Sequence, residues 1–173
     1  EPLLQATDPE RFHPDPALAD TGEPVLFVGN SRKVFRPVVR DLLAAGVDVG
    51  LYGAGWEAFV DAAHVRARLL ANDELPLHYR RAGVVLNDHW DDMRLAGFWS
   101  NRLFDAAASG ARVVSDHIEG TERLFGGPPD RRALAELLLE RQGIVTRDGV
   151  RGEGIPGGYG AVYKNAVKQG HYT

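Results

Sequence analysis

Two short apolar runs on either side of a helix-forming segment constrain the fold of this chain more than any other feature. Residues 84–86 and 113–114 have the length and composition of buried strands. Between them, the segment from Ser100 to Gly110 opens with a good helix cap, contains three alanines and closes with a glycine, which suits the left-handed position after a helix. The order strand, slim helix, strand predicts an α/β fold with a Rossmann-like doubly wound parallel sheet.

The same alternation is predicted along the rest of the chain. Additional strands are predicted at residues 24–28, 47–52 and 64–66, and helices at residues 34–45, 73–80 and 130–138. In the first of these helices, valines and leucines are expected to face the sheet, whereas Arg36 and Arg40 are assigned to the solvent-facing side. A sheet of this kind binds ligands at the carboxyl ends of its strands, where the loops to the helices begin.

One of these helix starts carries residues suited to a phosphate. Arg102 lies in the first helical turn, where the helix dipole disfavours a cation by roughly 0.3–1 kcal/mol unless an anion binds there. A phosphate would accept hydrogen bonds from this guanidinium and from the free N–H groups after Ser100. Asp105 follows Arg102 at i+3 and Asn101 at i+4, so all three are predicted to share one helical face, with Asp105 placed to bind ribose hydroxyls. The alternative is an exposed ion pair between Arg102 and Asp105.

The loop after the first strand is a second candidate phosphate site. Gly29 and Asn30 offer backbone N–H groups at the strand end, and Arg32 offers another cation for phosphate or sugar. The competing interpretation is an ordinary strand-to-helix turn, which uses the same residue types. In the loop after the second strand, Trp56 could line the same pocket, but a role as a packing anchor is favoured.

Two sequence motifs carry a resemblance to a known family. The first is Tyr-Arg-Arg-Ala-Gly-Val-Val-Leu-Asn from Tyr79, and the second is Arg-Leu-Phe-Asp-Ala-Ala-Ala-Ser-Gly from Arg102. With them, residues 79–125 resemble the nucleotide-sugar-binding half of GT-B glycosyltransferases, most closely the spore-maturation group with its Arg-x-Phe-Glu pattern. A weaker likeness extends back to Val25. Two departures stand out: Asp105 replaces the usual Glu, and Gly97 stands where the wider retaining group has another Glu, which leaves the stereochemical course open.

The resemblance implies specific roles for residues of this chain. Arg102 and the helix start would face the diphosphate of an NDP-sugar donor, and Asp105 would bind its ribose. Leu75 and Pro76 fall in the region that approaches the base in this family. The family's chemistry is generally metal-independent, so neither a metal nor a cofactor other than the donor substrate is expected. Catalytic residues stay unknown, because the acceptor and the acid–base group are expected from an acceptor-binding domain in the same or another chain. The isolated chain is therefore expected to bind donor without hexosyltransferase-like activity.

Length and composition set the expected organisation. A chain of 173 residues with 44% apolar content fits one domain. Residues 1–23 are predicted to form an extended arm or linker, residues 24–142 the donor-binding domain, and residues 143–173 a Gly-rich tail without assigned structure. The net charge of −4 with dispersed basic residues argues against a nucleic-acid partner, and no run approaches the roughly 18 apolar residues of a membrane span. The absence of cysteine is compatible with the cytoplasmic location that we expect.

Other interpretations of the function and of single residues stay open at this level. A non-catalytic nucleotide- or protein-binding module, or another enzyme with a phosphate ligand, could use the same fold. Residues 87–92 mix His89 with carboxylates, but their spacing argues against a metal site. His89, Phe98 and Trp99 are instead predicted to form the rim of the ligand cleft. His117 is the one candidate for acid–base work, and its alternative is an ordinary loop histidine.

Overall fold

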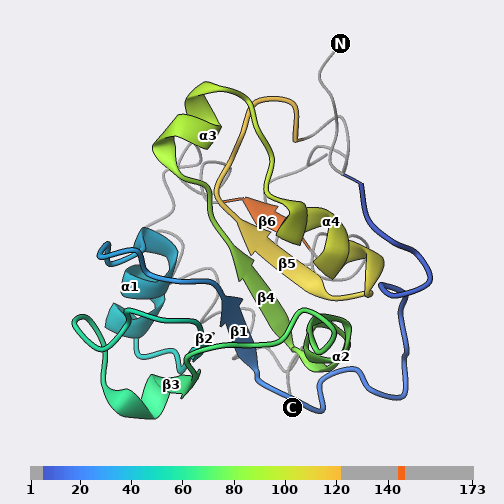
Figure 1. Cartoon of the computed structure of the whole chain (residues 1–173), viewed down its shortest axis with the longest axis horizontal. Coiled ribbons are helices and arrows are strands. Elements are labelled where there is room, and N and C mark those ends of the chain that lie inside the picture. The colour runs from blue at the N-terminus through green and yellow to red at the C-terminus, as the bar shows by residue number, and fades with distance from the viewer. Residues whose placement is uncertain (1–5, 122–143, 147–173) are drawn as a thin grey trace.

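A six-stranded parallel sheet forms the centre of the computed structural model, which describes residues 6–121 and 144–146. The strand order is β3-β2-β1-β4-β5-β6, and every neighbouring pair is parallel (Figure 1). The strands are β1 (Val25–Val28), β2 (Gly50–Tyr52), β3 (Val65–Ala67), β4 (Val84–Asn87), β5 (Arg112–Ser115) and β6 (Ile144–Thr146). The helices are α1 (Pro37–Ala44), the 3-10 turn η1 (Ala62–His64), α2 (Leu75–Arg81), α3 (Asp91–Leu95) and α4 (Asn101–Ala108). The predicted α/β Rossmann-like fold is confirmed.

Successive residues of a strand point to opposite sides of the sheet, so the apolar strands present buried side chains on both faces. Both faces are therefore covered. Val25 and Phe27 belong to a core cluster that α1 closes with Val38, Val39 and Leu42. On the other face, β1, β4 and β5 pack against α2, α4 and the N-terminal arm. The residues of this second cluster are Phe12, Leu26, Tyr79, Ala82, Val85, Leu103, Ala106, Ala111 and Val113. Each large apolar side chain that is fully buried contributes about 1.5–3 kcal/mol to stability, so the two clusters hold the layers together.

The start of α1 differs from the prediction. The helix begins at Pro37, not at residue 34, because proline fits the first helical position and restricts the residue before it to extended backbone. Arg36 therefore becomes the N-cap residue, with ψ 125°. Its predicted place on a solvent-facing side is wrong, since only 5% of the residue is exposed. This shift turns Arg36 from a surface cation into part of the interior.

Three elements are absent from the sequence prediction, namely the 3-10 turn η1, the short helix α3 and strand β6. The short helix α3 begins with Asp91 and Asp92 and leaves Leu95 90% exposed, so it has no apolar stripe by which to recognise it. Strand β6 pairs with β5 in register Val113 to Ile144 and lies in the region for which no element was predicted. The predicted helix at residues 130–138 lies outside the described residues.

The N-terminal arm, residues 6–23, runs along α4 and α2 before it enters β1 (Figure 1). Phe12 is buried against Tyr79, with ring centroids 6.2 Å apart. The guanidinium of Arg80 donates to the carbonyls of Arg11 and His13, at 2.6 and 2.8 Å. These contacts fasten the arm to the domain on the side where α4 presents Asp105.

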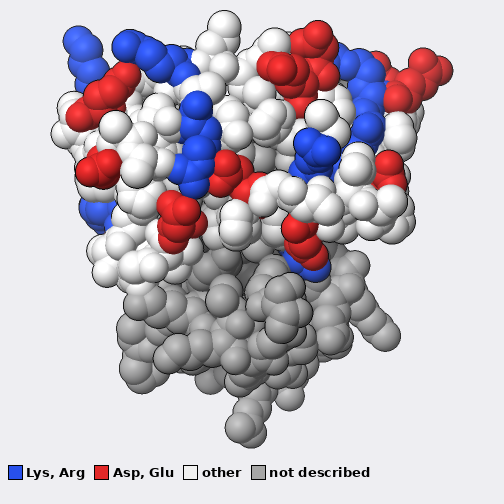
Figure 2. Space-filling view, turned by 90° about the horizontal axis from the view of Figure 1, so that it is seen from below, with Lys and Arg blue, Asp and Glu red and all other residues white. Residues whose placement is uncertain are grey.

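Two further observations concern membrane spans and surface charge. Among the described residues, no helix has both the length and the apolar content needed to cross a bilayer. On the face seen in Figure 2, acidic and basic side chains are interspersed over the described part of the chain.

Candidate functional site

The point where the sheet changes direction lies between β1 and β4. The chain moves outward from β1 to β2 and β3, then returns to place β4 on the other side of β1, so the loops after β1 and β4 leave in opposite directions. A cavity of about 560 Å³ lies at this edge. Its walls come from the loop after β1, the start of α1, the loop after β4, α3, and Asp116 after β5. This is the position at which doubly wound sheets bind their ligands.

A buried ion pair forms one wall of the cavity. Arg36 donates from Nε and Nη2 to the two oxygens of Asp88, at 2.7 and 2.5 Å, and the two side chains are only 6% and 7% exposed. The guanidinium carbon of Arg36 lies 3.7 Å from the ring centre of Trp90, and that of Arg32 lies 5.4 Å from the same centre. Burial raises the pKa of Asp88, while the hydrogen bonds from Arg36 oppose this shift. The pair therefore ties the loop after β1 to the loop after β4.

Arg102 reaches the same edge from the first turn of α4. Its Nη1 donates to Oδ1 of Asn87 at 3.0 Å, and its Nη2 donates to the carbonyl of Val28 at 2.5 Å. The guanidinium carbon also lies 4.9 Å from the ring centre of Phe27. A Cβ atom at Gly29 would lie 3.0 Å from Nη2, so glycine leaves room for this approach. The guanidinium is thus fixed at the carboxyl ends of β1 and β4.

Asp105 points away from Arg102 and toward the arm. Its Oδ1 accepts a hydrogen bond from the Thr7 hydroxyl at 2.7 Å, and its Oδ2 accepts one from the Asn101 amide at 2.7 Å. Burial raises the pKa of Asp105, whereas these two hydrogen bonds lower it. Asn101 and Asp105 therefore share a helical face as predicted, whereas Arg102 bonds to the sheet edge instead, and the structure does not show the alternative Arg102–Asp105 ion pair among the described residues.

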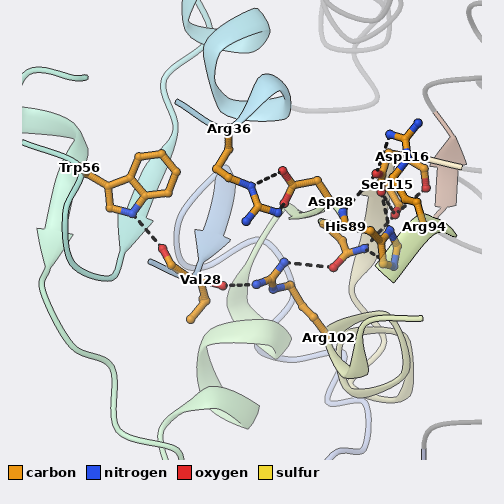
Figure 3. A network of polar contacts seen from close by, with 11 residues as sticks. Val28, Arg36, Trp56, Asp88, His89, Arg94, Arg102, Ser115 and Asp116 are labelled. Atoms are coloured by element: carbon orange, nitrogen blue, oxygen red, sulfur yellow. Dashed lines mark hydrogen bonds and ion pairs between the residues drawn. The ribbon is translucent and has the colours of Figure 1, made fainter. Parts of the chain in front are cut away.

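A second polar group follows the carboxyl ends of β4 and β5 (Figure 3). The amide nitrogen of Asn87 donates to Oγ of Ser115 at 2.9 Å. Next to it, Nδ1 of His89 lies 2.6 Å from Oδ1 of Asp116, and Arg94 approaches the other oxygen of Asp116 at 3.4 Å. Hydrogen bonds therefore connect Arg102 with side chains on the cavity wall.

Of the other predicted site residues, one lines the cavity and the rest take part in local backbone structure. Arg32 is exposed and lines the cavity. Asn30 uses its side-chain oxygen to accept the N–H of Ala54 at 2.7 Å, which joins the loops after β1 and β2. Ser100 is the N-cap of α4 as predicted, although its side chain makes no capping hydrogen bond, and Gly110 has the expected positive φ of 79°.

The predicted base contacts and Trp56 lie in or beside the hydrophobic core. Leu75 and Pro76 form the first turn of α2, where Pro76 is buried and Leu75 packs against the second core cluster. Trp56 is fully buried against Phe27 and donates from its indole nitrogen to the carbonyl of Gly29 at 2.8 Å. The packing interpretation of Trp56 is confirmed.

Of the three residues predicted for the rim, His89 lines the cavity, whereas Phe98 and Trp99 are not among its wall residues. Trp99 packs against Phe104, with ring centroids 6.2 Å apart. His117 is half-buried in the loop after β5, beside a separate hollow next to α3. Among the described residues, no group of three or more His, Asp or Glu side chains is arranged to hold a metal ion.

Several cavity residues were missed by the sequence prediction, namely Arg36, Asp88, Trp90, Arg94 and Asp116. The sequence held one usable signal for them, the Arg-Pro pair at residues 36–37, which places the arginine before the helix and near the strand end. The convergence of the others depends on strand order, which the local pattern does not contain.

Comparison with known proteins gives one match. The model of a family described as glycosyl transferase-like matches residues 31–136, which is more than half of the chain. The match includes the loop after β1 from Ser31 onward, the buried pair and α4. Neither the curated proteins nor the solved structures contain a significant match.

Proposed function

We propose that this chain, which belongs to the glycosyl transferase-like family, is the donor-binding domain of a GT-B glycosyltransferase that uses an NDP-sugar. The observation that supports this most directly is the position of Arg102, whose guanidinium is fixed at the carboxyl ends of β1 and β4 beside the start of α4. A helix start with a fixed guanidinium suits a diphosphate. In this proposal the acceptor and the acid–base group come from an acceptor-binding domain in the same or another chain.

The chemistry proposed for Arg102 is stabilisation of the leaving group. As the bond between the sugar and the β-phosphate breaks, negative charge grows on the diphosphate. Arg102 uses one N–H of each terminal nitrogen for Asn87 and Val28, and a guanidinium has further N–H groups to donate. Because its position is already fixed, little reorganisation is needed as the charge develops. In the proposed mechanism Arg32, which lines the cavity at the same sheet edge, adds a second positive charge, and no metal ion is needed.

Binding of the ribose by Asp105 requires a change at the N-terminal arm. Asp105 is only 8% exposed, and its Oδ1 already accepts the Thr7 hydroxyl. A ribose hydroxyl would form the same kind of hydrogen bond, so we propose that the ribose replaces Thr7 at this oxygen. Leu75 and Pro76, at the start of α2, remain the proposed contacts on the base side.

The first test uses the 173-residue chain and a panel of ADP, GDP, CDP and UDP with the matching nucleosides, measured by isothermal titration calorimetry. At least one diphosphate is expected to bind more than about tenfold more tightly than its nucleoside, because the Arg102 contact needs the phosphates and charge-assisted bonds contribute about 1.5–3 kcal/mol. Equal affinity within every pair would remove the basis for a phosphate site.

The second test concerns the ribose. Asp105→Asn is expected to weaken binding of the ribonucleoside diphosphate by about three- to tenfold, since a carboxylate accepts stronger hydrogen bonds than an amide. The loss should be smaller for the 2′-deoxy analogue. Thr7→Val should instead strengthen ribonucleotide binding, because the competing hydroxyl is gone.

A control for the ribose test is Thr21→Val, since the Thr21 hydroxyl bonds to the carbonyl of Leu18 elsewhere in the arm. It should leave both affinities unchanged. A Thr7→Val variant that weakens ribonucleotide binding, or an Asp105→Asn variant with parental affinity, would argue that the ribose binds elsewhere.

A further inference from the structure

The amide of Asn87 lies at the centre of the buried polar group next to Arg102. Asn87 is the last residue of β4, and neither it nor Ser115 is exposed to solvent. Its oxygen accepts the hydrogen bond from Nη1 of Arg102 at 3.0 Å, and its nitrogen donates to Oγ of Ser115 at 2.9 Å. The nitrogen also lies 3.4 Å from Nε2 of His89. Arg102 comes from α4, Ser115 is the last residue of β5, and His89 belongs to the loop after β4.

The partners of Asn87 determine which side of its amide faces Arg102. Asp116 accepts the backbone N–H of His89 at 3.1 Å and pairs with Nδ1 of its ring at 2.6 Å, which fixes the ring with Nε2 toward Asn87. The hydroxyl of Ser115 donates to the backbone carbonyl of Asp116 at 2.9 Å, which leaves its oxygen to accept from Asn87. The guanidinium of Arg102 only donates and the Ser115 oxygen accepts, so the amide oxygen of Asn87 faces Arg102 and its nitrogen faces Ser115.

We infer that Asn87 is a positioning residue that orients Arg102 for the diphosphate, with Ser115, His89 and Asp116 setting the orientation of its amide. This inference rests on the proposed role of Arg102. Without the Asn87 oxygen, the guanidinium keeps the Val28 carbonyl, the Tyr79 hydroxyl and the Phe27 ring as partners, but it loses its acceptor at the end of β4. The remaining N–H groups are then held less rigidly, so part of the preorganisation toward the diphosphate is lost.

A double-mutant cycle with the full chain tests this inference. Asn87→Ala, Arg102→Ala and the double variant are titrated with ADP, GDP, CDP and UDP, and unfolding in urea is measured alongside. Asn87→Ala is expected to weaken diphosphate binding by about three- to tenfold in the parent. In the Arg102→Ala background the same change should have almost no effect, because a residue that acts only through Arg102 loses its role with it.

Two further variants separate orientation from general loss of stability. Ser115→Ala removes an acceptor of the amide nitrogen and should weaken binding less than Asn87→Ala, again only while Arg102 is present. Ser109→Ala is the matched control, since its buried hydroxyl donates to the backbone carbonyl of Asp105 at 2.8 Å, outside this group. It should lower stability without changing the affinity for diphosphate.

The outcomes distinguish the inference from the proposed function. If Arg102→Ala itself leaves diphosphate affinity unchanged, the proposed function is wrong and the inference falls with it. If Arg102→Ala weakens binding while Asn87→Ala and Ser115→Ala do not, only the inference is overturned. Fully additive losses in the double variant would also overturn it, because Asn87 would then act independently of Arg102. If Asn87→Ala does not fold, the same cycle is carried out with Ser115→Ala.

Discussion

Replacing Arg102 with alanine is expected to weaken nucleoside diphosphate binding by roughly ten- to a hundredfold, or about 1.5–3 kcal/mol. The guanidinium is held between Asn87 and Val28 at the edge where β1 and β4 end, so its orientation is fixed before a ligand arrives. A lysine at this position would keep the charge but not the planar arrangement of donors. Arg102→Lys should therefore bind with an affinity between those of the parent and the alanine variant.

The measurement is a calorimetric titration of both variants, with circular dichroism to establish that the fold is intact. Arg68→Ala is a suitable control, because the Arg68 side chain is 75% exposed and pairs with Glu57 on the surface. Its effect on affinity should be within error. Parental affinity in a folded Arg102→Ala variant would falsify the assignment of this residue to the diphosphate.

Replacing Asp88 with alanine is expected to lower the free energy of unfolding by about 3–5 kcal/mol, because it leaves the buried charge of Arg36 without its partner. The pair connects the loops on both sides of the cavity, so the loss should also disturb the contact between Arg36 and Trp90. Urea unfolding followed by tryptophan fluorescence, to which Trp56, Trp90 and Trp99 all contribute, measures the change in stability.

Two comparisons define the cause of this destabilisation. Glu57→Ala breaks an ion pair in which both side chains are exposed and should change stability by less than about 1 kcal/mol. The double variant Arg36→Met, Asp88→Leu removes both charges and should recover most of the stability lost in Asp88→Ala. If Asp88→Ala cost no more than Glu57→Ala, the buried pair would not be what holds the two loops together.

The sequence alone was sufficient for the framework of the domain. Runs such as residues 84–86 are apolar without interruption, which indicates a strand buried on both faces, and parallel sheets have that property. The ends of α4 were also predictable, because Ser100 and Gly110 act through local backbone geometry. The same local reasoning placed Arg102 in the first turn of α4, and the structure brings it to the carboxyl ends of β1 and β4.

The partners of the charged residues were decided only by the tertiary structure. Thr7 meets Asp105 across 98 positions of sequence, and Arg36 meets Asp88 across 52. A helical wheel places Arg102 and Asp105 on one face, yet the strand ends offer Arg102 the carbonyl of Val28, and the arm offers Asp105 a hydroxyl. Local periodicity determines which residues form an element and which side faces the core. Hydrogen-bond partners depend on strand order and register, which are set by how the layers pack.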